Sequence, residues 1–209
     1  MSFIKQKTRR NLGACRKIKK QLGVSAMLSL YHSMIESHIR KGITSWCHGN
    51  SVKKNAIQRS CDSFLKMTFS TSNPNVLRSK MIEKRLLTID QLLFFEIGLT
   101  MLKIHNKSFP SCFNDFFTET SHSMNTRSNR SFNIDHPRIE LTKQSLNYKG
   151  NMEWSKIPNA VKYLRNSDPP ELNSINVFKE KLKDFVLAEG PSAISFHLNQ
   201  ILYSNHIYA

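Results

Sequence analysis

The chain has 209 residues, a hydrophobic fraction of 39% and a formal net charge of +16. Its length fits one domain, or one domain with a small appendage, and its hydrophobic fraction lies below the roughly 45–50% usual for globular chains. No run of about 18 apolar residues occurs, and no apolar segment follows the basic N-terminal residues, so neither a transmembrane helix nor a secretory signal is expected. The four cysteines form no CxxC pair, which indicates reduced thiols in an intracellular protein.

The positive charge is concentrated in the first part of the chain. Residues 1–60 hold thirteen Lys and Arg and one acid, a net charge of +12, which leaves +4 for the remainder. A dense cationic surface attracts polyanions because binding releases condensed counterions. Anionic membrane and a solvated basic tail are the alternative interpretations. The residues expected to contact RNA or DNA backbone are Lys5, Lys7, Arg9, Arg10, Arg16, Lys17, Lys19, Lys20, Lys53, Lys54 and Arg59.

The spacing of apolar residues predicts a mainly α fold, an irregular helical bundle with a small β-hairpin region and polar loops. Five segments repeat apolar residues at helical spacing. Ser25 is expected to cap the first helix, and Gly42 to end its pattern. The predicted helices cover residues 25–39, 52–68, 76–87, 89–105 and 174–187.

The fourth predicted helix is expected to be the centre of the core. Thr88 and Gln91 fit a capping box, in which the hydroxyl accepts from the third amide and the glutamine reaches back. The residues that follow, up to His105, are apolar almost all round the helix, and such a helix must be buried.

The character of the sequence divides the chain into five parts. They are a basic N-terminal segment, a helical domain, an aromatic cluster with a mobile polar loop, a hairpin or pair of short extended segments (138–148, closed by Gly150) with a C-terminal helix, and a tail without a clear pattern. Their limits are 1–24, 25–108, 109–137, 138–189 and 190–209.

Four sets of short stretches, in a fixed order, resemble one protein family. They are Leu22–Ile39 with Gly42 and Trp46; Ile57–Cys61; Leu99–Asn106; and a set made of His122–Arg127, Tyr148–Gly150, Trp154–Pro158 and Phe178–Leu182. In this order they are similar to the C-terminal, thumb or post-palm region of non-LTR (jockey-like) retrotransposon reverse transcriptases. The resemblance implies a helical, thumb-like domain from an RNA-directed DNA polymerase. It also implies a grip on the nucleic-acid backbone, because thumb helices of this family hold the template–primer duplex.

The chain departs from the family in ways that matter for activity. Lys41 stands where a tyrosine usually precedes Gly42, and Cys47 and His48 separate Trp46 from its glycine. Polymerisation needs clustered carboxylates that bind two metal ions, and the family carries an adjacent aspartate pair. No polymerase chemistry is therefore assigned, since no two aspartates are neighbours. They are Asp62, Asp90, Asp115, Asp135, Asp168 and Asp184.

Other site chemistries compete with structural roles. Cys47 and His48 with Cys61 or His38 offer zinc ligands, but their spacing matches no finger or knuckle, and Cys61 fits a buried thiol on an apolar stripe. The two tryptophans, Trp46 and Trp154, are expected in the core rather than stacked on bases. No Gly-x-Ser-x-Gly turn or Gly-rich phosphate loop occurs, so no hydrolase, cofactor or small-molecule substrate is expected.

The sequence therefore predicts a non-catalytic fragment of a reverse transcriptase with weak, sequence-independent affinity for RNA or DNA. One alternative is a co-opted cationic adaptor that binds RNA or chromatin. Another is a translated relic without function. The basic run from Arg16 to Lys20 fits a nuclear signal, but such runs are common, so the expectation is an intracellular protein with the nucleus as one of its candidate locations.

Overall fold

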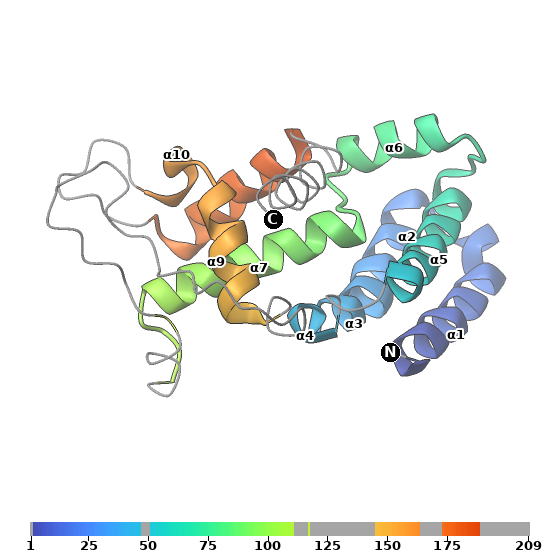
Figure 1. The fold of residues 1–209 in the computed structure, drawn as a ribbon. Helices are drawn as coiled ribbons and strands as arrows, with labels where there is room; N and C mark the ends of the chain where they lie inside the picture. Colours follow the sequence, from blue (N-terminus) through green and yellow to red (C-terminus); the bar gives the residue numbers. More distant parts are fainter. Residues whose placement is uncertain (1, 47–50, 111–116, 118–144, 164–172, 189–209) are drawn as a thin grey trace, which may run out of the picture. The chain divides into compact units, whose positions relative to one another are not determined.

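The computed structural model describes residues 2–46, 51–110, 117, 145–163 and 173–188 (Figure 1). Within these residues the chain is mainly helical and no β-strand occurs, which confirms the predicted mainly α class. The chain forms two compact units, Met1–Leu93 and Phe94–Ala209, and the division falls inside helix α7. None of the described helices is long and apolar enough to cross a membrane. The five-part division of the sequence stays a prediction.

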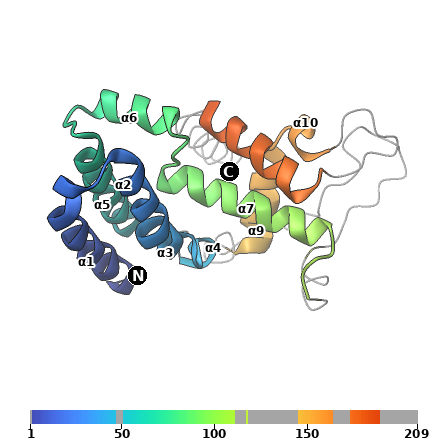
Figure 2. The ribbon, with the colours of Figure 1, turned by 180° about the vertical axis from the view of Figure 1, so that it is seen from behind.

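The first unit is a bundle of three helical rods with one further helix packed on the third. The middle rod is continuous from α2 through a π-helical turn into α3, as the view from behind shows (Figure 2). α1 and α5 pack on each other and on this rod, and α6 packs on α5. In chain order the elements are α1 (Ser2–Ile18), η1 (Lys19–Gln21), α2 (Val24–Leu30), η2 (Tyr31–Glu36), α3 (Ser37–Arg40), α4 (Ile43–Trp46), α5 (Ser51–Phe69), α6 (Pro74–Glu83) and α7 (Ile89–His105).

The N-terminal basic segment is not a solvated tail. α1 buries Leu12 and Cys15, which are 8% and 1% exposed, and Asn11 Nδ2 donates to the carbonyl of Met34 at 2.6 Å. A helix that buries one face against two neighbours is held in place by that face. Its basic residues therefore occupy defined positions.

The middle rod carries its buried residues at a strict spacing of four. Met27, Tyr31, Ile35 and Ile39 are each at most 4% exposed. In an α-helix with 3.6 residues per turn, positions four apart drift around the axis. The wider π-helical turn at Tyr31–Glu36 offsets this drift and keeps the four side chains on one face. The sequence predicted this helix but not its π-turn.

The ends of the middle rod test two sequence expectations. Gly42 adopts a φ of +79°, a conformation that suits glycine, and the helical pattern ends there as predicted. The predicted cap at Ser25 is wrong, because the helix begins at Val24 with Gly23 in the N-cap position and no side-chain cap bond. The Ser25 side chain lies inside the first turn, two residues past the N-cap position.

The capping box before α7 is confirmed. The amide of Gln91 donates to Thr88 Oγ1 at 3.3 Å, and the amide of Thr88 donates to Gln91 Oε1 at 3.0 Å. The next amide is satisfied from a neighbouring helix, because Ile89 N donates to Gln58 Oε1 at 2.7 Å. Three amides at the start of α7 are thus bonded to side chains, which fixes where the helix begins.

We expect Thr88→Ala to lower the free energy of unfolding by about 1 kcal/mol, because the Gln91 amide loses its acceptor at the helix start. Urea denaturation measures the change. Thr88→Ser keeps the hydroxyl and should remain within about 0.5 kcal/mol of the wild type. Equal losses in both variants would show that the methyl group, rather than the cap, stabilises this position.

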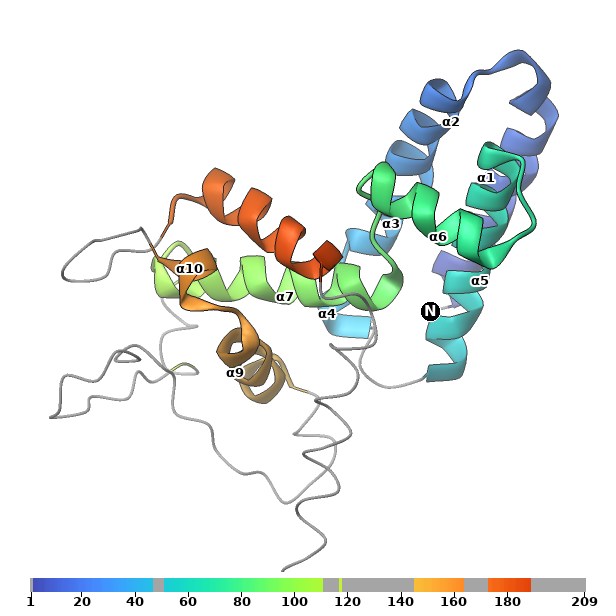
Figure 3. The same cartoon turned by 90° about the horizontal axis from the view of Figure 1, so that it is seen from above.

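The second unit packs three helices around the middle and end of α7. α9 (Leu146–Lys156) and the helix over residues 175–188 lie on either side of α7 (Figure 3). The short helix α10 (Asn159–Lys162) follows α9. Nearly every apolar residue of α7 is buried, as the sequence predicted for the centre of a core.

Two glycines let the helices of the second unit approach closely. A Cβ on Gly98 would lie 2.8 Å from Leu182 Cδ2 and 3.1 Å from Ile157 Cδ1, and one on Gly150 would lie 2.7 Å from Met101 Sδ. Both distances near 2.8 Å are too short for a real carbon contact. Gly150 therefore sits inside α9 for packing and does not close a hairpin.

The predicted hairpin at 138–148 is wrong where the structure describes it, since Leu146–Lys156 is helical. Ser145 explains the difference, because its Oγ accepts from the amide of Tyr148 at 3.4 Å and caps the helix start. Residues 138–144 of that prediction lie outside the described residues. So do nearly all of the predicted aromatic cluster and polar loop, and the tail.

An aromatic stack fills the core of the second unit. The ring of Trp154 lies 4.9 Å from that of His105 and 5.8 Å from that of Phe178, measured between centroids. Trp154 is 3% exposed, which confirms its predicted place in a core. Lys162 Nζ lies 5.1 Å from the centroid of the same indole, and burial lowers the pKa of this amine to about 8.

The buried amine of Lys162 makes stability depend on pH. Between pH 8 and about 10.4, its value in an unfolded chain, the unfolded state holds a proton that the folded state releases, so this residue's contribution to stability rises with pH. Lys162→Met lacks the titration. The free energy of unfolding of the variant minus that of the wild type should therefore be larger at pH 7 than at pH 10, as followed by urea denaturation. A gap that does not change with pH would contradict a perturbed Lys162.

Candidate nucleic-acid interface

The two basic segments of the sequence lie side by side in the first unit. α1 and α5 run in the same direction (Figure 1). Arg16 Nη2 donates to Ser63 Oγ at 3.4 Å, and Lys19 Nζ donates to Ser70 Oγ at 3.3 Å. The pairs are 47 and 51 residues apart in sequence, so the end of α1 and the following turn η1 lie beside the second half of α5 and the residue after it.

An open groove of about 540 Å³ lies between these helices. Its cationic residues are Arg9 and Arg16 from α1 and Arg59 from α5. The other residues that line it are small or apolar, and two carry hydroxyls. They are Leu12, Gly13, Ala56, Ser60 and Ser63.

The charge of the three groove arginines is not compensated within the described part of the chain. All three are exposed, and none makes an ion pair with a described carboxylate. Asp62 is the acid nearest in sequence on α5, but it does not line the groove and accepts from Gln58 Nε2 at 2.7 Å. The whole first unit, with eighteen Lys and Arg against four acids, has a net charge of +14. The groove is therefore a site of positive potential that suits an anion.

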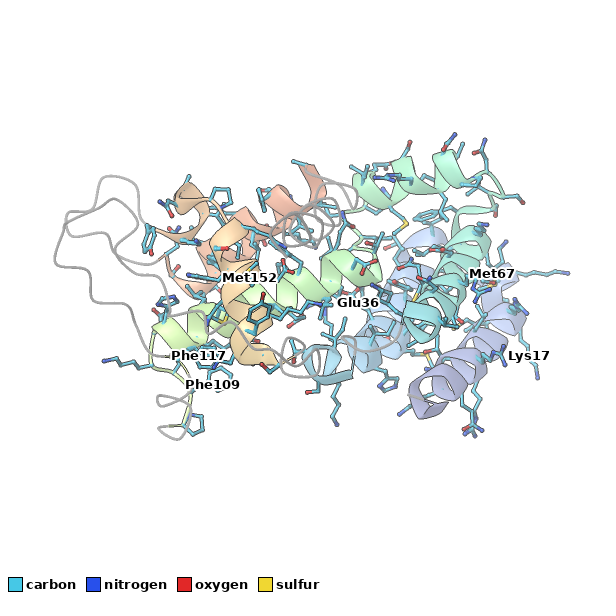
Figure 4. The ribbon with its side chains drawn as sticks, in the orientation of Figure 1. Lys17, Glu36, Met67, Phe109, Phe117 and Met152 are labelled. Atoms are coloured by element: carbon cyan, nitrogen blue, oxygen red, sulfur yellow. The ribbon has the colours of Figure 1, made fainter. Side chains whose placement is uncertain are left out.

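The remaining predicted contact residues fall into different places. Arg10 and Lys17 are exposed on α1, where Lys17 points away from the bundle (Figure 4). Lys20 is exposed in η1, in which Lys19 is half-buried beside Ser70. These positions leave Arg10, Lys17 and Lys20 open to a long polyanion. They do not line the groove.

Two predicted contact residues are engaged inside the protein. Lys54 forms an ion pair with Asp90, and its side chain is 24% exposed. Lys7 is half-buried and has an interaction of its own. Both are thus weaker candidates for a phosphate contact than the sequence suggested. Lys5 and Lys53 lie in α1 and α5, but the structure does not describe their side chains.

Sequence reasoning missed part of the interface. Gly13, Ser60 and Ser63 line the groove, and nothing in the order of residues marks them as a set, because α1 and α5 meet only in the fold.

Other candidate chemistries have structural explanations. Cys61 is buried, and burial raises the pKa of its thiol to about 12. This confirms the predicted buried thiol. No cluster of three or more His, Cys, Asp or Glu suited to a metal ion occurs among the residues that the structure describes. The Cys47 and His48 pair and the side chain of Trp46 lie outside the described residues.

Comparison of the chain with protein-family models, curated proteins and solved structures found no match. The similarity to reverse transcriptases thus rests on its four sets of stretches alone. In the fold, two signature residues of the last set, Trp154 and Phe178, pack against each other in the second unit. Their role in the second unit is to pack its core.

Proposed function

We propose that the chain is a non-catalytic fragment of a non-LTR retrotransposon reverse transcriptase that binds RNA or DNA backbone without sequence preference. The observation that carries the binding proposal is the groove between α1 and α5. There, Arg59 of α5 lies with Arg9 and Arg16 of α1, from which it is distant in sequence, and no described carboxylate lies against the three. The guanidinium group pairs well with phosphate because its planar N–H groups form two parallel hydrogen bonds with two oxygens.

The lack of sequence preference follows from the kind of groups present. Guanidinium and serine hydroxyl groups in the groove reach phosphate and sugar oxygens, and such contacts position a nucleic acid without distinguishing its bases. A base-reading site needs side chains directed at base edges. The polar and charged side chains of the described groove, three guanidinium groups and two serine hydroxyls, suit contact with the nucleic-acid backbone.

The absence of catalysis is proposed from the carboxylates. Asp62 accepts a hydrogen bond from Gln58, and Asp90 forms an ion pair with Lys54, so each has a partner within the first unit. Metal-dependent polymerisation requires carboxylates that are clustered and directed at the metal ions. The parent enzyme would carry that site in a palm domain.

Fluorescence anisotropy with a labelled RNA hairpin and a labelled DNA duplex, across a salt series, tests the binding proposal. Contact with three phosphates predicts a slope of log K against log salt of about −3 for duplex DNA, and steeper if residues on α1 outside the groove join in. Similar affinities for the two ligands are expected. Binding that is absent at low salt, or that does not respond to salt, would contradict the proposal.

A further inference from the structure

We infer that a single polynucleotide strand lies along the groove between α1 and α5, and that its backbone comes closest to the protein at Gly13. This inference rests on the proposed nucleic-acid binding and adds which residue sets the depth of the site and which form of nucleic acid fits it.

Gly13 has no role in the fold that would require a glycine. It lies within α1, it is exposed, and a Cβ built on it would have no neighbouring atom within 4 Å. Glycine in the middle of a helix is unfavourable relative to alanine. The glycines of the second unit differ, because Gly98 and Gly150 meet neighbouring side chains where a Cβ would stand. The open space above Gly13 is the groove itself.

The surroundings of Gly13 are charged. Arg9 and Arg16 flank it on α1, three or four residues away on either side, and Arg59 lies across the groove. A glycine allows a ligand's backbone to approach a helix closely, since no side chain covers the peptide groups. A phosphate chain resting there would lie within reach of positive charge from both walls.

The position of the groove between two packed helices favours one strand. Packed helices have axes about 8–10 Å apart, so the groove between them seats one phosphodiester chain; a free strand can lie along its whole length, whereas a duplex contacts it with only one of its two backbones. Arg9 and Arg16 are seven residues apart, roughly 10 Å along the helix, so they contact different phosphates of that strand. Ser60 and Ser63 line the opposite wall. The Ser63 hydroxyl, which accepts a hydrogen bond from Arg16 at 3.4 Å in the free protein, turns to a phosphate oxygen when the strand binds.

Gly13→Leu tests the inference, with Ala14→Leu as the matched control. Ala14 is the next residue on α1, is exposed and does not line the groove. Anisotropy is measured with a labelled oligothymidylate and with a duplex of equal length, and thermal unfolding of each variant is followed by circular dichroism. We expect Gly13→Leu to keep or raise the thermal midpoint and to weaken single-strand binding about tenfold or more, which corresponds to about 1.4 kcal/mol. Ala14→Leu should bind as the wild type does.

The outcomes separate this inference from the proposed function. A wild type that binds neither ligand would remove the proposed function. A wild type that binds, with Gly13→Leu of equal affinity for the oligothymidylate, would overturn the inference and leave the proposed function standing. An equal loss for single strand and duplex would overturn the single-strand occupant. If Gly13→Leu unfolds, Gly13→Ala decides: a raised thermal midpoint with weaker binding supports the inference, and unchanged binding contradicts it.

Discussion

Replacement of Arg9, Arg16 and Arg59 by glutamine in one variant is expected to reduce the slope of log K against log salt by about 2 to 3. Each arginine that contacts a phosphate releases close to one counterion, so three lost contacts remove that share of the salt dependence. Affinity at low salt should fall by at least about tenfold, because hydrogen bonds between charged groups are lost as well. The measurement is the same anisotropy series, with wild type and variant side by side.

A second triple variant of equal charge separates the groove from overall charge. Lys41, Arg78 and Lys84 are exposed in the first unit and do not line the groove. Their replacement by glutamine removes the same three charges, and we expect the slope to change by less than about 1. Equal losses of slope in the two variants would show that binding follows net charge, and the groove would have no special part in it.

Phe178→Ala is expected to lower the free energy of unfolding by about 3–5 kcal/mol, the largest stability effect that the structure indicates. Phe178 is 0% exposed and packs against Trp154 at 5.8 Å between ring centroids. Removal of the ring loses buried apolar surface and leaves a cavity among helices that cannot close it fully. Urea denaturation followed by tryptophan fluorescence, which reports on the neighbouring indole, measures the loss.

Val177→Ala is the control for this variant, since Val177 is the preceding residue of the same helix and is 43% exposed. Its free energy of unfolding should stay within about 0.5 kcal/mol of the wild type. A loss in Phe178→Ala as small as that in Val177→Ala would contradict the assignment of Phe178 to the centre of the second unit.

Local signals in the sequence were sufficient for the helices that carry a strong pattern. The capping box at Thr88 and the apolar surface of α7 are properties of neighbouring residues, and both were predicted correctly. The helix at Ser145 was missed because Gly150 normally interrupts a helix. Here its missing side chain makes room for Met101, which lies 49 positions earlier. The π-turn at Tyr31–Glu36 likewise serves contacts with other helices.

The candidate site shows the same division between local and distant information. The sequence identified the basic residues, since charge density needs no fold to be seen. It did not show which would lie together, because the groove depends on the packing of α1 on α5, roughly 50 residues later. Lys54 was expected to be free for phosphate, but it pairs with Asp90, 36 residues away.

The most direct test of phosphate binding in the groove is an NMR titration of the arginine Nε–Hε signals with oligothymidylate. The account predicts that the signals of Arg9, Arg16 and Arg59 shift together and saturate at the concentration at which anisotropy saturates. The signal of Arg78, exposed on α6, should stay in place. Saturable binding with unmoved groove signals would contradict the account, because the phosphates would then be held elsewhere on the protein.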